Sequence, residues 1–298
     1  MTLDGLINVL VTVLLVEMMI AIGLDVTLAE LSDVVRNGRL LGFTLLANYI
    51  CFPAITVGLL LLLRPADPTV SIGFLILAVC PGAPFGPPCT RLAGGNVATA
   101  VGLMAILAGT SALAAPLLLR WLLPLLAKAG TLEVNSARIF GTLLVTQLVP
   151  LCLGLWLRQR RPNLAARLVK PAGQICSLLG LVTVALILYA QSGMLAEIRL
   201  RGYGAMLLLL LASFAMGWLC GGPEHGNRKA VTLTTSLRNV GVGLVIATGT
   251  FANTAAPTAV LAYGLIEIAG SLLLACAWGW QSAAGQPATP PDRSAIVE

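Results

Sequence analysis

Charged residues are scarce in this sequence, and their scarcity excludes an ordinary soluble domain. Lys, Arg, Asp and Glu make up 10% of the 298 residues, whereas about 25% is usual in soluble proteins. Hydrophobic residues make up 58%, and the mean hydropathy is +0.94. This composition is typical of an all-α protein that crosses the membrane several times.

Histidine is also scarce, because the chain has only His225, in the polar segment GGPEHGNRK. The sequence offers no second His, and Cys220 is the single Cys near it, so no metal site and no cofactor are predicted. The seven cysteines have neither metal-ligand nor redox spacing, which argues against a disulfide framework. The apolar segments contain no Ser–His pair and no paired aspartates, so an intramembrane enzyme is disfavoured.

Long apolar segments predict nine membrane-spanning helices. A helix needs roughly 20 apolar residues to cross about 30 Å of hydrocarbon. The first segment lacks a basic start and a small-residue cleavage site, so it is interpreted as a span and not as a cleaved signal. Because of Pro116, the fourth segment is expected to tilt, kink or end early. The nine segments are 5–24, 40–63, 70–93, 97–119, 138–158, 171–192, 203–222, 229–251 and 257–280.

Basic residues other than Arg238 lie between the spans or at their ends, which explains the net charge of +6 without a nucleic-acid partner. The segment RQRRPNLAARLVK, residues 158–170, holds five of them and is predicted to be cytoplasmic by the positive-inside rule. Alternation from this point places the N-terminus outside a plasma (inner) membrane and the C-terminus in the cytoplasm. The polar, Pro-rich tail 281–298 is predicted to be disordered.

Two spans carry residues that interrupt a helix. CPGAPFGPP, residues 80–88, has four prolines and two glycines, and proline removes a donor and clashes with the preceding turn. TTSLRNVGVG, residues 234–243, interrupts a span in the second half of the chain. Paired interruptions of this kind form the substrate and ion sites of secondary transporters. The placement suggests an inverted repeat, with halves at 1–126 and 127–280.

These segments carry a resemblance to a known family. IGLDVTLAEL (22–31), LANYICFP (46–53), the CPG and TRLAGGNVA stretch (80–98), SLRNVGVGL (236–244) and GSLLLACAW (270–278) resemble the bile acid:sodium symporter family. The resemblance implies a nine- or ten-helix inverted repeat with a panel domain and a core domain, in which two broken helices cross. It also implies sodium-coupled import of an organic anion.

The chain departs from the family at the positions where the resemblance places sodium ligands. These positions hold Gly86, Pro87, Ala100, Met104, Thr234 and Arg238, whereas Asn48 and Asn239 keep a polar side chain. A hard cation needs several oxygen ligands. A guanidinium about 4 Å away would repel it by about 4 kcal/mol at an effective dielectric constant near 20. These departures argue against sodium binding in the family's manner.

The remaining hypothesis is that Arg238 is a built-in cation that replaces sodium and contacts an anionic substrate. A charge inside a span needs a partner, and Glu267 is the preferred partner, with Glu17 second. Either carboxylate could carry a proton, which would make transport proton-linked; otherwise it is uncoupled. The predicted substrate site comprises Arg238, Asn239, Glu267, Asn48 and Thr234. The alternatives are a permanent Arg–Glu bridge in a receptor or structural protein, and an arsenite-type exporter of related fold.

Overall fold

The computed structural model describes residues 3–63, 67–126, 136–190, 200–252 and 254–284. All its regular elements are helical within these ranges. In chain order they are α1 (Leu3–Asp25), α2 (Leu28–Arg36), α3 (Gly38–Leu46), the π-helical turn η1 (Ala47–Cys51), α4 (Phe52–Leu63), α5 (Pro68–Ala78), α6 (Gly86–Leu92), α7 (Val97–Leu126), α8 (Ser136–Leu143), the π-helical turn η2 (Leu144–Leu148), α9 (Val149–Arg160), α10 (Pro162–Ala190), α12 (Leu200–Cys220), α13 (His225–Ser236), α14 (Val240–Thr250) and α15 (Ala256–Ala284).

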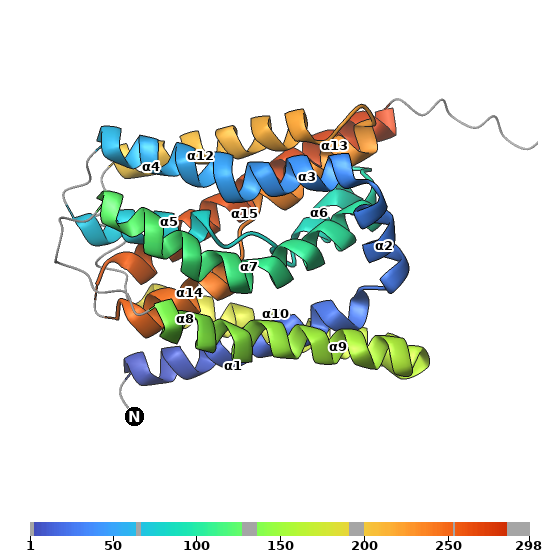
Figure 1. The fold of residues 1–298 in the computed structure, drawn as a ribbon, viewed down its shortest axis with the longest axis horizontal. Coiled ribbons are helices and arrows are strands. Elements are labelled where there is room, and N and C mark those ends of the chain that lie inside the picture. The colour runs from blue at the N-terminus through green and yellow to red at the C-terminus, as the bar shows by residue number, and fades with distance from the viewer. Residues whose placement is uncertain (1–2, 64–66, 127–135, 191–199, 253, 285–298) are drawn as a thin grey trace, which may run out of the picture.

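The helices form layers that run roughly parallel to one another (Figure 1). One outer layer contains α1, α8, α9 and α10, and α1 packs along both α9 and α10. The opposite outer layer contains α3, α4 and α12, with α13 and α15 beside them. Helices α5, α6, α7 and α14 lie between the two, and α2 crosses from the first layer to the second at one end.

Seven helical segments are long and apolar enough to cross a membrane, among the residues that the structure describes. They confirm an all-helical membrane protein and coincide with seven of the predicted spans. The other two predicted spans are not continuous helices. The third is divided between α5 and α6, and the eighth between α13 and α14.

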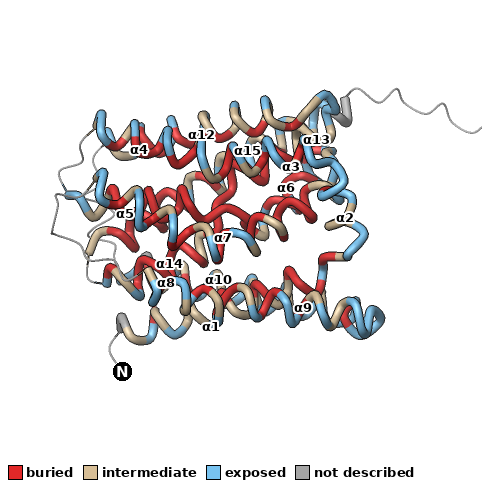
Figure 2. Tube along the Cα trace, in the orientation of Figure 1, coloured by how far each residue is buried: buried red, intermediate tan, exposed pale blue. Residues whose placement is uncertain are grey.

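Burial is concentrated in the central layer, where most residues of α5, α6 and α14 and about half of those of α7 are buried (Figure 2). The outward faces of the flanking helices expose large apolar side chains, including Leu62, Leu219 and Trp280. Exposed apolar surface on this scale is unusual for a soluble monomer. Lipid covers such a surface in a membrane protein, so the burial pattern agrees with the composition.

Close packing within the first layer depends on two glycines. Helices α1 and α9 cross at Gly23 and Gly154, where a Cβ on either residue would collide with the backbone of the other helix. Small residues let helix backbones approach in this way inside membranes. The crossing therefore fixes α1 against α9.

Three predicted boundaries are wrong in detail. The first interruption ends at Phe85 and not at residue 88, because Pro87 and Pro88 lie in the first turn of α6, where the missing N–H costs no hydrogen bond. Helix α7 does not end at Pro116 but continues to Leu126. Residues 281–284 of the predicted disordered tail belong to α15, and the rest of that tail lies outside the described residues.

Candidate functional site

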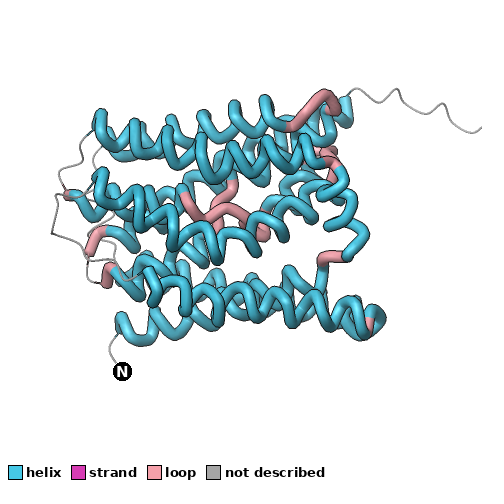
Figure 3. Tube along the Cα trace, viewed as in Figure 1, coloured by secondary structure: helices cyan, strands magenta, loops and turns pink. Residues whose placement is uncertain are grey.

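The two interrupted spans meet at the centre of the molecule, where their non-helical segments cross (Figure 3). Pro81 and Arg238 form an isolated antiparallel β-bridge. The backbone N–H of Asn239 donates to the carbonyl of Cys80 at 2.8 Å, and its side-chain Nδ2 donates to the carbonyl of Gly82 at 3.2 Å. The carbonyls of Cys80 and Gly82 are therefore satisfied by the other interruption, as irregular backbone at membrane depth requires.

Gly82 allows the first interruption to lie against α7. Its φ is +91°, a conformation that L-residues with a Cβ rarely adopt. A Cβ at this position would also collide with the backbone of Ala108. Both the turn and the close approach to α7 therefore require glycine.

The second interruption is shorter than predicted, and only 237–239 lie between α13 and α14. Asn239 caps α14, because its Oδ1 accepts the backbone N–H of Val242 at 3.1 Å. Asn239 therefore fixes the position of the first interruption relative to the second. Thr234 lies inside α13, where its hydroxyl donates to the carbonyl of Ala230 at 2.8 Å and its methyl group faces Gly86. The structure thus gives Thr234 a packing role between α13 and α6.

Arg238 is almost completely buried, with 1% of its surface exposed. Its Nη1 donates to Oδ1 of Asn48 at 2.7 Å, and its guanidinium lies 4.0 Å from the ring centre of Phe52. Both contacts come from the segment η1–α4, in which Asn48 and Phe52 are four residues apart and share a face. A buried cation is thus held by an amide oxygen and an aromatic ring.

Glu267 contacts Arg238, but through the backbone and not through the guanidinium. Its Oε1 accepts the backbone N–H of Arg238 at 2.8 Å, and no ion pair joins the two side chains. The two residues are therefore in contact, but the predicted salt bridge between their side chains is not formed. The physical reason is the interruption itself, which leaves the N–H of Arg238 without a helical acceptor, and a buried donor needs one.

Several buried polar atoms around Arg238 have no hydrogen-bond partner among the described residues. They are Nε and Nη2 of Arg238, Oε2 of Glu267 and the hydroxyl of Tyr263. Tyr263 and Glu267 are four residues apart on α15, and both lie within electrostatic range of the guanidinium. We refer to Arg238, Asn48, Phe52, Tyr263 and Glu267 as the Arg238 cluster. The cluster offers hydrogen-bond donors that could bind an anion, and one carboxylate oxygen that could accept a proton.

Asn48 occupies the π-helical turn η1, a feature that is frequent at functional sites. Its Nδ2 donates to the carbonyl of Thr44 at 2.9 Å and to Oγ1 of Thr235 at 3.1 Å. Its oxygen is therefore directed at Arg238, and the amide cannot rotate without losing these bonds. Asn48 and Arg238 are therefore in direct contact.

Glu17 lies elsewhere, in α1, where its carboxyl group is beside Cys176 of α10. No ion pair connects it to Arg238 in the ranges that the structure describes. One of its oxygens is buried without a partner. Glu17 is thus separate from the Arg238 cluster.

Sequence reasoning missed Phe52 and Tyr263 as members of the cluster. A signal was present for both, because each lies four residues from a predicted site residue on the same helical face. It also left Ser271 out of the site. Ser236 and Ser271 share a hydrogen bond of 2.9 Å that joins α13 to α15.

No metal centre is built from these side chains. Among the described residues, no group of three or more His, Cys, Asp or Glu side chains could hold a metal ion. Gly86, Pro87, Ala100 and Met104, the positions where the resemblance places sodium ligands, provide no side-chain oxygen.

The chain is similar to known transporters along most of its length. A model of the sodium bile acid symporter family matches residues 12–197. The uncharacterized sodium-dependent transporter YocS of Bacillus subtilis (strain 168) is 25% identical over 268 residues, which cover 88% of this chain and 81% of that protein. The probable sodium/metabolite cotransporter BASS2, chloroplastic, of Oryza sativa subsp. japonica is 25% identical over 261 residues, which cover 84% of this chain and 60% of the rice protein.

Proposed function

Because the chain belongs to the sodium bile acid symporter family, as its motifs predicted, we propose that it is a secondary transporter of a small organic anion. Families of this kind transport solutes and are not enzymes. The substrate is a bile-acid-like or carboxylate solute, moved by alternating access between the two sides of the membrane. The Arg238 cluster is the substrate site.

The observation that carries this proposal is the buried guanidinium of Arg238 with two unused nitrogens. Its Nη1 is held by Asn48, whereas Nε and Nη2 have no partner within the described part of the chain. These two nitrogens lie on one edge of the planar fork, the geometry that binds a carboxylate through two parallel hydrogen bonds. A fixed cation that is already desolvated would attract an anion strongly.

The same guanidinium argues that sodium is not the coupling ion. Repulsion of about 4 kcal/mol corresponds to a loss of nearly a thousandfold in sodium affinity. The oxygen ligands that could offset it are missing at the four positions noted above. The word "sodium" in the names of the two relatives describes those proteins, and in this chain Arg238 would take the place of the ion.

Proton coupling is the alternative that Glu267 supports. Its Oε1 accepts the backbone N–H of Arg238, and its Oε2 is buried without a partner. Protonation of the carboxyl group would weaken its hydrogen bond to the N–H, because a neutral oxygen is a poorer acceptor than a carboxylate, and would so loosen the contact between α15 and the second interruption. Glu17 of α1, beside Cys176, is the second candidate for the proton-carrying group.

The proposed topology has nine passes in a plasma (inner) membrane. The pairs α5–α6 and α13–α14 each count as one broken span, and the inverted halves are 1–126 and 127–280. The N-terminus lies outside and the C-terminus in the cytoplasm, which places the basic segment 158–170 on the cytoplasmic side. The outer layer of α1, α8, α9 and α10 would be the panel against which the remaining helices move.

The test is uptake into proteoliposomes of a panel of carboxylates and sulfonates. Sodium is replaced by choline, and each substrate is measured with and without a pH gradient. We expect uptake that does not depend on sodium. An inward proton gradient should either stimulate this uptake or leave it unchanged. Strictly sodium-dependent uptake would show that Arg238 does not replace the ion. Absence of uptake of the whole panel, with the protein folded, would favour a receptor or structural role.

A further inference from the structure

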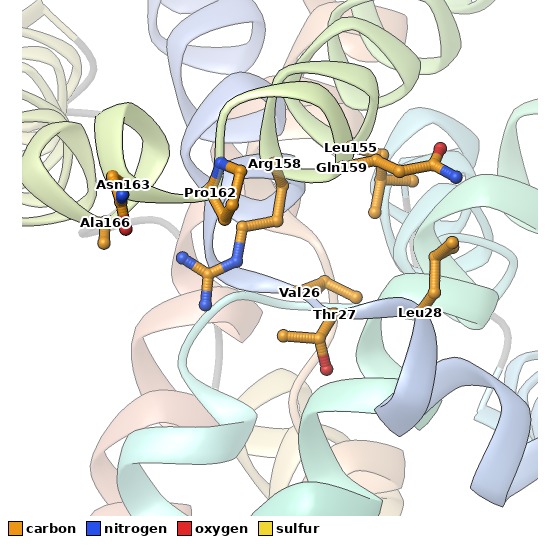
Figure 4. Close-up of a pocket in the computed structure, with 9 residues that line it drawn as sticks. All are labelled: Val26, Thr27, Leu28, Leu155, Arg158, Gln159, Pro162, Asn163 and Ala166. Carbon is orange, nitrogen blue, oxygen red and sulfur yellow. The ribbon is translucent and has the colours of Figure 1, made fainter.

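A pocket of about 450 Å³ lies at the end of the molecule where the turn between α1 and α2 faces the turn between α9 and α10. It shares no residue with the Arg238 cluster. Its lining comes from the α1–α2 turn, the last turns of α9 and the first turns of α10 (Figure 4). The lining residues are Val26, Thr27, Leu28, Leu155, Arg158, Gln159, Pro162, Asn163 and Ala166. A volume of this size suits a small ligand.

Arg158 is the only charged side chain in this lining. It is half-buried, and it makes no hydrogen bond or ion pair with any residue that the structure describes. Figure 4 shows its guanidinium reaching from α9 into the space between Asn163 and Thr27. A guanidinium directed into a pocket without a partner is suited to binding an oxyanion through two parallel hydrogen bonds.

Further groups at the pocket favour negative charge. Helix α10 begins at Pro162, so its positive dipole end lies at the pocket wall. The amides of Gln159 and Asn163 supply donors that bind no described residue. Thr27 is not available, because its hydroxyl donates to Glu30 at 2.7 Å in the cap of α2.

Two carboxylates lie near the pocket but do not line it. Glu30 is engaged in the cap of α2 by Thr27, and the exposed Asp25, at the end of α1, lies within range of Arg91 as well as Arg158. The basic segment that follows Arg158 adds Arg160 and Arg161 nearby in the sequence. Arginines therefore outnumber these two carboxylates in the segments around the pocket.

The remaining walls are apolar and are formed by Val26, Leu28, Leu155, Pro162 and Ala166. A free inorganic ion would leave this surface uncovered, whereas an apolar body attached to the oxyanion would cover it. We propose that the pocket binds the phosphate or carboxylate head of an amphiphilic anion, with Arg158 as its principal ligand. The bound anion would join the α1–α2 turn to the α9–α10 turn.

Two sources share this chemistry, an anionic phospholipid and a soluble amphiphilic anion, and two probes distinguish them. The full chain is placed in phosphatidylcholine nanodiscs. In one arm, native mass spectrometry follows the retention of phosphatidylglycerol as its share of the bilayer is raised. In the other arm, hexyl phosphate is titrated calorimetrically. Binding of either probe supports the site and identifies the source.

Variants then assign the binding to the pocket. Arg158→Gln is expected to lower the affinity for the probe by about tenfold or more, the loss expected when a hydrogen bond to a charged group is removed. Arg160→Gln is the matched control, since it removes the same charge from the same segment outside the lining, and we expect less than about a twofold change from this residual long-range attraction. Ala166→Trp fills the pocket without changing charge and should also abolish binding, whereas Leu168→Trp on α10 should not.

The proposal would be overturned by either of two results. One is that neither probe binds the folded protein. The other is that Arg158→Gln and Arg160→Gln weaken binding equally while Ala166→Trp has no effect, which would indicate diffuse attraction to a basic surface. Neither result bears on uptake through the Arg238 cluster, because no transport is measured.

Discussion

Nη1 of Arg238 and Oδ1 of Asn48 lie 2.7 Å apart, although 190 residues separate them in the sequence. This hydrogen bond connects the second interruption to the π-helical turn η1, in the outer layer that contains α3 and α4. It gives a permanently charged side chain one fixed partner and leaves its other nitrogens uncommitted. One nitrogen of the guanidinium is therefore held in place, whereas Nε and Nη2 have no hydrogen-bond partner among the described residues.

Substitution of Asn48 should destabilise the protein more than substitution of its neighbour Thr235. Asn48→Leu leaves the buried guanidinium without its acceptor and should lower the free energy of unfolding by about 2–3 kcal/mol. Thr235→Val removes only a neutral hydrogen bond, which is worth about 0.6 kcal/mol inside membrane proteins. Thermal unfolding in detergent micelles measures both. Equal losses would mean that Asn48 does not support the charge of Arg238.

Substitution of Arg238 should weaken anion binding without unfolding the protein. Arg238→Gln removes the charge and should weaken binding of a transported anion by about thirtyfold or more, equivalent to roughly 2 kcal/mol. Arg238→Lys keeps the charge but loses the planar fork, so an intermediate affinity is expected. Affinity is measured by calorimetry and the melting temperature serves as the control. Unchanged affinity with a lower melting temperature would indicate a purely structural role.

The sequence was sufficient to locate the interruptions but not to assign their contacts. Prolines in residues 80–88 and the polar run 234–243 identify the places where helices cannot continue, because that information is local. The direction of the Arg238 side chain is not local, since it depends on how α13 packs against η1. The pairing with Glu267 was consequently predicted between the right residues and the wrong atoms.

The π-helical turn at Asn48 had no signal in the sequence. Its five residues, ANYIC, contain neither Pro nor Gly, so propensity predicts an ordinary helix. The same holds for the pocket at Arg158, which requires two turns that are more than 100 residues apart. Basic residues there were interpreted only as a marker of orientation. Packing between elements that are distant in the sequence decides where such a turn or pocket forms, and it cannot be predicted from local residue patterns.

Gly82 should tolerate no side chain. Gly82→Ala places a Cβ against the backbone of Ala108 and forces a non-glycine residue to φ +91°. The conformation alone costs roughly 1–2 kcal/mol, so the melting temperature and the yield of folded protein should both fall. Gly42→Ala is the control, because a Cβ there meets nothing within 4 Å and the residue lies within a helix. A stable Gly82→Ala variant would contradict the observed crossing of the interruptions.

Glu267 and Glu17 can be distinguished as proton carriers by their amide variants. Glu267→Gln keeps an oxygen that can accept the backbone N–H of Arg238, so the fold and substrate exchange across the membrane should survive. It removes the titratable group, so accumulation driven by a pH gradient should disappear, which uptake into proteoliposomes with an imposed gradient measures. Glu17→Gln should leave this accumulation intact, because Glu17 lies beside Cys176 and away from the cluster. The reverse result would transfer the coupling role to α1, and accumulation that survives in both variants would mean that neither carboxylate carries the proton.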